Sequence, residues 1–399
     1  MSTESIEVNT VVTSANETGD VSVVTTPHTD QRMDGPAMGQ RILDVRKFSV
    51  DYGWGETAVR AVNSVDLHLD RSKVLGIAGE SGSGKSTLVY GLTRLLRAPG
   101  VVAGGEVLFN LGPGEDSVER VIDLVTASEK ELRDVRWSNI SIVLQSALSA
   151  LNPVLRVSTQ FEQVLKVHRR DMSKTDRRAR AIELLALVGL NEDRLRRYPH
   201  ELSGGQRQLV MIALALALDP ELVIMDEPTT ALDVVTQREI ISKLYELRSR
   251  FGFAMIFITH DLSLLVELAD EIVVMYAGAL VERASAQALY DTPRHPYSLG
   301  LLNSFPPMHG ARTELTGIPG SPPDLTALPT GCSFHPRCPY AMDRCLNESP
   351  TLVDLGDDGR SVACWLHSGE PGVVVPVELS RTGRGKREPA PMPVKEVLS

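Results

Sequence analysis

The nine residues 79–87, with the sequence GESGSGKST, constrain the fold of this chain more than any other stretch. Ahead of them, the apolar run VLGIA over residues 74–78 predicts a short buried strand. Behind the lysine, residues 86–90 (STLVY) predict the first turn of a helix. A strand that passes into a helix through a glycine-rich loop ending in Gly-Lys-Ser is the Walker A arrangement, in which the loop backbone surrounds phosphate groups.

The residue types in this loop suit phosphate binding. Glycines at positions 79, 82 and 84 allow backbone conformations that point several N–H groups inward. The helix N-terminus adds the positive end of its dipole. Lys85 can reach the β- and γ-phosphates, and the Ser86 hydroxyl can ligate Mg²⁺. The stretch therefore predicts a nucleoside triphosphate site.

Four further elements follow in a fixed order, each with polar residues next to an apolar run. They are Gln145 after the run 140–144, the LSGGQ sequence of residues 202–206 ahead of an apolar helix over 209–218, Asp226 and Glu227 after the run 222–225 with the turn Ala231-Leu232-Asp233 beyond, and His260 after the run 254–259. Together with the glycine-rich loop, these elements resemble the nucleotide-binding subunit of an ATP-binding cassette (ABC) transporter over about residues 42–370. The LSGGQ sequence separates ABC ATPases from other phosphate-loop proteins, and it is unaltered here.

The resemblance implies an α/β fold of the P-loop ABC ATPase type. Its parallel core sheet would surround the Walker A loop, with antiparallel strands near the N-terminus and a helical subdomain at about 150–218. In that subdomain, Ser173 is expected to cap a helix that runs through Leu187 and stops at Gly189. The expected domains are a disordered tail (1–40), the ABC ATPase (41–290), a small C-terminal extension containing cysteines (291–368) and a flexible tail (369–399).

The resemblance also assigns chemical roles to the polar residues. Glu227 would act as the general base or position the attacking water, and His260 would contact the γ-phosphate as the switch residue. Because phosphoryl transfer depends mainly on positioning and charge neutralisation, Lys85, Mg²⁺ and His260 would carry most of the rate. Asp226 ends a buried strand and can hold the ion through its water shell. The expected Mg²⁺ ligands are Ser86, Gln145 and Asp226.

An aromatic ring is expected to stack on the adenine. Tyr52 follows the predicted strand 48–50, where the family has such a ring, and Trp54 could serve instead. The alternative is that Tyr52 is an ordinary aromatic residue at a strand end. The full set of residues expected to contact ATP is Tyr52, Gly79, Glu80, Ser81, Gly82, Ser83, Gly84, Lys85, Ser86, Thr87, Gln145, Ser203, Gly204, Gly205, Gln206 and Asp233.

The LSGGQ sequence predicts a partner. Ser203, Gly204 and Gly205 stand at the start of a helix and so form a second anion-binding terminus, which a chain with one phosphate loop does not need. In ABC ATPases this sequence closes on ATP held by the other subunit, in a head-to-tail sandwich. The chain has no internal repeat. We therefore expect a second ATPase subunit, identical or related.

Composition argues against nucleic acid as a ligand and against a membrane-spanning protein. The formal net charge is −10, and no basic patch of the kind that nucleic-acid binding requires is evident. The basic run over residues 169–180 is interrupted by Asp171 and Asp176, which predicts a solvated helical face. No apolar run reaches the roughly 18 residues that span a bilayer, and the first forty residues lack a secretory signal. We expect a peripheral protein on the cytoplasmic face of the membrane.

Residues after the ATPase motifs narrow the subfamily. Residues 294–302 (RHPYSLGLL), 318–323 (IPGSPP) and 331–339 (GCSFHPRCP) resemble the C-terminal extension of oligopeptide and dipeptide importer ATPases, and Asn152-Pro153 also fits. There are two departures from the family pattern. Ser146-Ala147 replaces an acidic residue and a proline where the transmembrane subunits dock, and residues 233–236 (DVVT) are reshuffled.

The expected function is therefore ATP hydrolysis that powers peptide import. The expected partners are the second ATPase subunit, two transmembrane permease subunits and an extracytoplasmic solute-binding protein. One alternative is the same machine carrying nickel or another small solute. Another is a soluble ABC ATPase acting on DNA or ribosomes. Such proteins carry a long coiled coil between the motifs or two cassettes in one chain, and this sequence has neither. A third makes the extension a redox- or metal-sensing module that regulates the ATPase.

The four cysteines of the chain are clustered at Cys332, Cys338, Cys345 and Cys364. In the cytoplasm, disulfides are disfavoured, and four thiolates suit zinc or an iron–sulfur cluster. No Cys-x-x-Cys pair of the kind common in zinc sites occurs. This spacing, together with the resemblance to importer extensions, favours a structural 4Fe–4S cluster over Zn²⁺. The alternative is four unrelated buried thiols.

Overall fold

The computed structural model describes residues 40–113, 119–144, 150–230, 232–304, 317–356 and 359–379. Gln145 and Ala231 lie outside the described residues, as does the departure at Ser146-Ala147. The same is true of residues 1–39, which make up nearly all of the predicted N-terminal tail, and of residues 380–399 in the predicted C-terminal tail.

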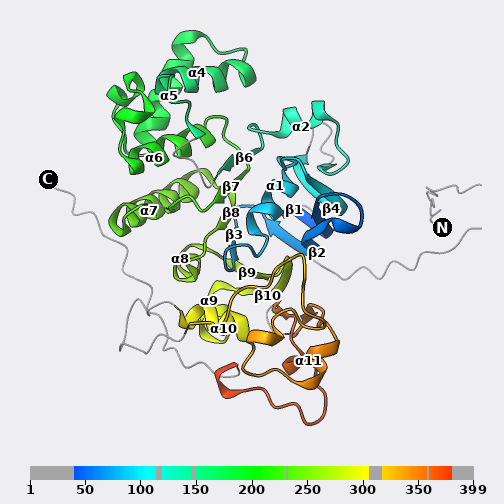
Figure 1. Cartoon of the computed structure of the whole chain (residues 1–399). Helices are drawn as coiled ribbons and strands as arrows, with labels where there is room; N and C mark the ends of the chain where they lie inside the picture. The colour runs from blue at the N-terminus through cyan, green and yellow to red at the C-terminus, as the bar shows by residue number, and fades with distance from the viewer. Residues whose placement is uncertain are drawn as a thin grey trace, which may run out of the picture. The chain divides into compact units, whose positions relative to one another are not determined.

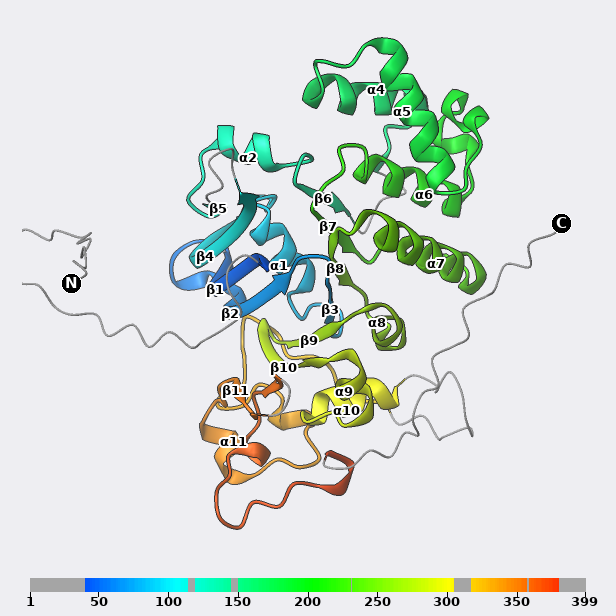
Figure 2. The same ribbon diagram turned by 180° about the vertical axis from the view of Figure 1, so that it is seen from behind.

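Four strands near the N-terminus form an antiparallel sheet in the order β2-β1-β4-β5 (Figure 1 and Figure 2). This sheet buries side chains such as Phe48, Val65 and Phe109 in a hydrophobic core that it shares with Leu88 and Leu92 of helix α1 (Lys85–Leu92). The antiparallel strands expected from the resemblance are thus confirmed. The strands are β1 (Arg41–Tyr52), β2 (Val59–Asp70), β4 (Gly100–Pro113) and β5 (Glu119–Asp123).

The second sheet has eight strands in the order β11-β12-β10-β9-β3-β8-β7-β6. The five strands β9, β3, β8, β7 and β6 run parallel. Every residue of β3, β7 and β8 is buried, as is usual for parallel strands covered on both faces. The strands are β3 (Val74–Ala78), β6 (Ile140–Val143), β7 (Leu222–Asp226), β8 (Ala254–Ile258), β9 (Glu271–Tyr276), β10 (Ala279–Ser285), β11 (Val353–Asp354) and β12 (Ser361–Val362).

Helices connect and cover these strands. The α-helices are α1 (Lys85–Leu92), α2 (Glu129–Val135), α4 (Val157–His168), α5 (Lys174–Leu187), α6 (Gly204–Ala215), α7 (Val234–Phe251), α8 (Leu262–Leu268), α9 (Ala286–Asp291), α10 (Pro296–Asn303) and α11 (Asp343–Asn347). Short 3₁₀ helices span Gly55–Thr57, Glu192–Arg196, Pro199–Glu201, His335–Arg337, Trp365–His367 and Val377–Leu379. No helix in the described ranges is long and apolar enough to cross a membrane.

The helices α4, α5 and α6 pack together as the predicted helical subdomain (Figure 2). The Ser173 side chain accepts a hydrogen bond from the N–H of Asp176, whose carboxylate accepts one from the Ser173 N–H, and this capping box starts α5. The helix ends at Leu187, and Gly189 follows with φ +81°. The predicted start and stop of this helix are confirmed.

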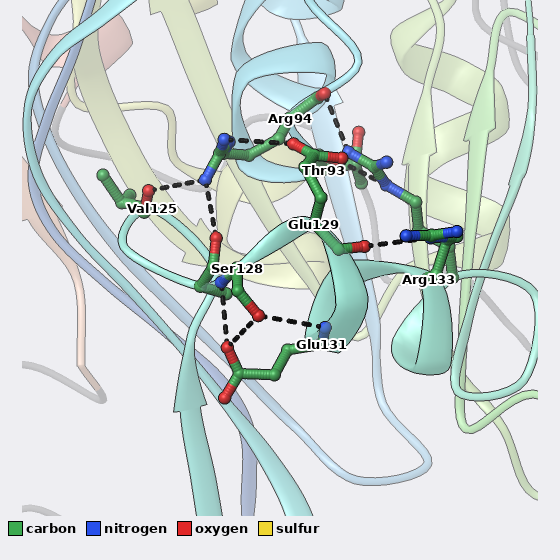
Figure 3. Close-up of polar contacts among 9 residues, drawn as sticks. Thr93, Arg94, Val125, Ser128, Glu129, Glu131 and Arg133 are labelled. Carbon is green, nitrogen blue, oxygen red and sulfur yellow. Dashed lines mark hydrogen bonds and ion pairs between the residues drawn. The ribbon is translucent and has the colours of Figure 1, made fainter.

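A similar capping box starts α2, where Ser128 and Glu131 exchange hydrogen bonds (Figure 3). Arg94, just beyond the end of α1, holds α2 in place. Its guanidinium donates to the carbonyl oxygen of Val125 at 2.9 Å and to the carboxylate of Glu129 at 3.4 Å. The helix that carries the glycine-rich loop is thereby tied to the segment before β6.

The extension adds two strands to the edge of the ATPase sheet. Strand β12 pairs with β10, and β11 pairs with β12, both antiparallel. Aromatic rings from the two segments also pack together. The ring of Tyr276 in β9 lies 4.6 Å from that of Tyr297 and 5.2 Å from that of Phe334, measured between centroids. The sequence analysis did not predict this continuation, because strands of two residues leave no periodic pattern.

A buried carboxylate fixes the start of α10. Glu282 in β10 is 1% exposed and accepts hydrogen bonds from the N–H groups of Arg294 (2.7 Å) and His295 (2.8 Å). Nδ1 of His295, itself 2% exposed, accepts the N–H of Tyr297 at 3.0 Å and caps the helix. Because the two N–H groups ahead of α10 and the cap of the helix are buried and satisfied, the start of α10 is fixed against β10.

The first prediction concerns the pH dependence of stability. Burial, with a smaller effect of nearby His367, lowers the pKa of His295 from 6.5 to about 3. The unfolded chain therefore binds a proton below pH 6.5 that the folded chain rejects, so His295 lowers stability as the pH falls. Between pH 7 and pH 5 this costs about 2 kcal/mol. His295→Asn keeps an oxygen that can cap α10 but does not titrate, so its unfolding free energy should fall less over this interval. An equal fall in unfolding free energy between pH 7 and pH 5 in the wild type and in His295→Asn, measured by urea unfolding, would contradict this.

Candidate functional site

The glycine-rich loop lies between β3 and α1 and has a backbone that only glycine fits at two points. Gly79 has φ +149°, and a Cβ there would lie 2.4 Å from the carbonyl oxygen of Met275. Gly84, the residue before α1, has φ +101°, and a Cβ there would lie 2.5 Å from the carbonyl oxygen of Ala61. The loop is therefore pressed against two other segments, which fix its shape.

Lys85 is held inside this loop. It is 5% exposed, and its Nζ donates to the carbonyl oxygens of Gly79 at 2.8 Å and Glu80 at 2.7 Å. Burial lowers the pKa of Lys85, while the carboxylates of Glu227, Asp226 and Glu80 oppose that shift. An ammonium group oriented by two carbonyls at the start of a helix is suited to bind phosphate oxygens.

Asp226 ends β7 directly beside the loop. It is 0% exposed, and its Oδ1 accepts a hydrogen bond from the Ser86 hydroxyl at 3.0 Å. Burial raises the pKa of Asp226, and the bond from Ser86 acts in the opposite direction. A buried carboxylate and a hydroxyl are oxygen donors of the kind that Mg²⁺ prefers. The two predicted metal ligands within the described residues thus lie together, and Gln145 lies outside those residues.

Glu227 and His260 come from the ends of neighbouring strands and meet. The Oε1 atom of Glu227 lies 3.8 Å from Nδ1 of His260, with side chains that are 13% and 58% exposed. Thr230 donates to the other carboxylate oxygen at 3.0 Å. Glu227 also has φ +45°, a backbone conformation that is costly for a residue with a side chain. The strained backbone points the carboxylate toward the imidazole at the edge of the site.

The LSGGQ sequence forms the N-terminus of α6. Ser203 is the N-cap and accepts the N–H of Gln206 at 3.2 Å. A Cβ on Gly205 would lie 2.5 Å from the methyl group of Thr236 in α7, so this glycine allows close packing between the two helices. Asp233 caps α7 by accepting the N–H and hydroxyl of Thr236 at 2.9 and 2.7 Å. The structure thus gives Asp233 a capping role, and its contact with ATP stays a prediction.

Tyr52 and Trp54 lie at the end of β1. Tyr52 pairs with Gly100, where an added Cβ would lie 3.0 Å from the Tyr52 ring, and it is therefore packed against β4. Trp54 is 70% exposed. The stacking role of Tyr52, and the alternative Trp54, stay predictions.

The extension contributes to this site in a way that the sequence patterns did not predict. Arg337 bonds to the Glu80 carboxylate through two nitrogens at 2.6 and 2.9 Å, and Tyr297 accepts the Glu80 N–H at 2.7 Å. Both residues stood in segments that served only as marks of the subfamily. A cleft of about 500 Å³ lies between the glycine-rich loop and the extension. It is lined by Gly79, Glu80, Ser81, His260, Leu301, Ser304, Ile318 and Pro322.

The predicted iron–sulfur or zinc site is wrong. Within the described ranges, no group of three or more histidine, cysteine, aspartate or glutamate residues is placed to hold a metal ion. Cys332, Cys338, Cys345 and Cys364 are free and line a cavity of about 10 Å³, which is the size of one water molecule and too small for a cluster. Burial raises the pKa of Cys338 to about 11 and that of Cys364 to about 12, so both thiols are protonated in this arrangement.

The second prediction compares two glycines of the loop. Both Gly82 and Gly84 have positive φ, but an added Cβ meets nothing within 4 Å at Gly82 and backbone at 2.5 Å at Gly84. Gly82→Ala should cost about 1 kcal/mol of unfolding free energy from backbone strain alone. Gly84→Ala should cost more than about 2 kcal/mol and weaken Mg-ATP binding at least tenfold, since the loop must move. Chemical unfolding and calorimetric titration measure both. Equal effects would contradict the close contact with Ala61.

The fold agrees with comparisons to known families and structures. Residues 62–230 match the ABC transporter family, and residues 281–345 match the oligopeptide/dipeptide transporter C-terminal region. Among solved structures, the dimeric structure of MJ0796, described as a bacterial ABC transporter cassette, superposes with a TM-score of 0.53 at 29% identity. The superposition covers 61% of this chain and 98% of that one.

Curated relatives cover most of the chain. It is 41% identical over 340 residues to the oligopeptide transport ATP-binding protein OppD of Bacillus subtilis. The aligned region covers 84% of this chain and 92% of that protein. The chain is 42% identical over 333 residues to the dipeptide transport ATP-binding protein DppD of Escherichia coli, which spans 83% and 98%. The chain therefore belongs to the ATP-binding proteins of the ABC transporter family, in the group that carries the oligopeptide/dipeptide transporter C-terminal region.

Proposed function

We propose that this protein binds and hydrolyses ATP to power the import of di- or oligopeptides through an ABC transporter. The observation that carries the proposal is the meeting of three groups at one edge of the parallel sheet. Lys85 lies in the glycine-rich loop, Asp226 lies beside Ser86, and Glu227 lies beside His260. The oligopeptide and dipeptide transport proteins to which the chain is about 40% identical support a peptide as the solute.

The loop and Lys85 bind the phosphates of ATP in this proposal. Inward N–H groups and the N-terminus of α1 attract the polyanion, and the ammonium group of Lys85 neutralises charge that develops on the β- and γ-phosphates. Ser86, Asp226 and Gln145 would hold Mg²⁺, which would supply further neutralisation of the phosphate charge. The other residues predicted to contact ATP would complete the site around the adenine and the phosphates.

Glu227 and His260 act on the attacking water. The carboxylate is 13% exposed and the imidazole 58% exposed, so a water molecule can reach the space beside them. Glu227 accepts a proton from that water or orients it, and His260 aligns it with the γ-phosphate. The bond from Thr230 holds one carboxylate oxygen and leaves the other directed toward His260.

A second ATPase subunit would complete each site, with Ser203, Gly204 and Gly205 at the start of α6 facing the γ-phosphate of ATP bound by the partner. Two transmembrane permease subunits and an extracytoplasmic solute-binding protein would make up the rest of the importer, with this chain peripheral on the cytoplasmic side. We further propose the division into an ATPase at 41–290 and an extension at 291–368 as the functional one. The match of residues 281–345 to the transporter C-terminal region supports a distinct C-terminal part, although that match begins at residue 281, ahead of the proposed boundary.

The third prediction separates binding from turnover. Glu227→Gln keeps the size and hydrogen bonds of the side chain but removes the base. ATP turnover should therefore fall at least about 100-fold while the Kd for Mg-ATP changes little, and ATP-bound protein should accumulate as a dimer in gel filtration. Lys85→Ala is the matched control, because it should weaken binding itself. Turnover near that of the wild type in Glu227→Gln would remove the role given to this residue.

The fourth prediction concerns pairing in trans. Ser203→Arg blocks the start of α6, and Lys85→Ala disables the phosphate loop, so each variant alone should be inactive. If the chain pairs with itself, a mixture of the two variants contains dimers with one intact composite site, and part of the ATPase activity should return. Activity that stays absent until a related second subunit is added would instead show an obligate heterodimer.

A further inference from the structure

Glu80, the second residue of the glycine-rich loop, is bonded through three different groups. Its carbonyl oxygen accepts from Lys85 Nζ at 2.7 Å, and its N–H donates to the Tyr297 hydroxyl at 2.7 Å. Its carboxylate accepts two hydrogen bonds from Arg337, at 2.6 and 2.9 Å. One residue thus connects the lysine of the nucleotide site to two residues of the extension.

Arg337 is held firmly in the orientation that this contact needs. Its Nε donates to the carbonyl oxygen of Pro319 at 2.7 Å, and its guanidinium carbon lies 5.9 Å from the centre of the Tyr276 ring. The side chain is 5% exposed and that of Glu80 is 26% exposed, so water screens the pair poorly. A two-pronged arginine–carboxylate contact in such surroundings is stronger and more directional than a surface ion pair.

The charge of Glu80 matters because of where it lies. Its carboxylate is one of three that act on Lys85, together with Asp226 and Glu227. A polyanionic ligand in the loop would be repelled by an uncompensated carboxylate on the loop itself. Arg337 cancels that charge and, through the same residue, steadies the carbonyl oxygen that orients Lys85.

We propose that Arg337 is a positioning residue for ATP, and that the extension sets the ATP affinity of the ATPase through the Arg337–Glu80 contact. This inference rests on the proposed nucleotide site and deepens it. Binding couplings are reciprocal. Bound ATP must therefore strengthen the attachment of the extension by the same factor by which the extension strengthens ATP binding.

The test is a double-mutant cycle on the full chain, with the Kd for Mg-ATP measured by calorimetric titration. Arg337→Gln should raise Kd about tenfold, which corresponds to 1.4 kcal/mol. The same change in a Glu80→Gln background should alter Kd less than about twofold, because no carboxylate is left to compensate. Arg337→Lys keeps the charge but not the two-pronged geometry, so its Kd should lie in between.

A kinetic readout separates positioning from loss of folded protein. The KM for ATP should rise with Kd in Arg337→Gln, while kcat changes less than about threefold, since Glu227 and His260 are untouched. A loss of active fraction would lower kcat and leave KM unchanged. Arg344→Gln is the matched control. Arg344 also pairs with glutamates and stacks on an aromatic ring, but its partners Glu348, Glu370 and Trp365 all lie outside the ATPase, so Kd should stay at the wild-type value.

Two results would overturn the inference. One is a folded Arg337→Gln protein with wild-type Kd. The other is an equal rise in Kd in both Glu80 backgrounds, which would mean that Arg337 does not act through Glu80. If Arg337→Gln fails to fold, Arg337→Lys supplies the same two comparisons. Failure of the proposed function looks different, because folded wild-type protein would then bind Mg-ATP no better than Lys85→Ala.

Discussion

The position of β3 between β8 and β9 determines where the candidate functional groups at the strand ends lie. Parallel pairing on both sides aligns the carboxyl ends of these strands, and β7 continues the alignment beside β8. The glycine-rich loop, the Asp226–Glu227 pair and His260 all follow directly from strand ends at that edge. A slip of one residue in this register would turn Asp226 to the opposite face of the sheet, so the buried side chains of β3, β7 and β8 are as necessary to the site as the polar ones.

The same pairing explains how the extension comes to touch the site. Strand β9 pairs with β3 on one side and with β10 on the other, and β10 pairs with β12 of the extension. The sheet therefore runs without a break from the nucleotide loop into the C-terminal segment. Glu282 on β10 fixes the start of α10, which carries Tyr297 to the Glu80 backbone. The C-terminal extension, which the sequence suggests is a separate addition, is therefore part of the ATPase sheet.

The sequence predicted those parts of the fold and site that depend on neighbours along the chain. The glycine-rich loop, the start of α5 at Ser173 and the polar residues Asp226, Glu227 and His260 at strand ends are local patterns, and the structure places them as expected. Arg337 and Glu80 are separated by 257 positions, and no local pattern reveals their contact. The prediction of a metal site at the four cysteines was wrong for the same reason. Four cysteines close in sequence suggested ligands, but the space between thiols depends on packing around Cys345 and Cys364, which spacing does not disclose.

Three carboxylates surround one buried lysine in a site proposed to bind a polyanion, and their surroundings give them different properties. Asp226 is fully buried beside a hydroxyl, which suits a site for a cation. Glu227 has a strained backbone and lies beside an exposed imidazole, which suits work on water. Glu80 is paired with an arginine from the far end of the chain. Because the charge of Glu80 is balanced by a residue outside the ATPase motifs, any change that withdraws Arg337 leaves a negative charge on the phosphate loop itself. ATP affinity in this protein therefore depends on how the extension is attached, as well as on the motifs that identify its family.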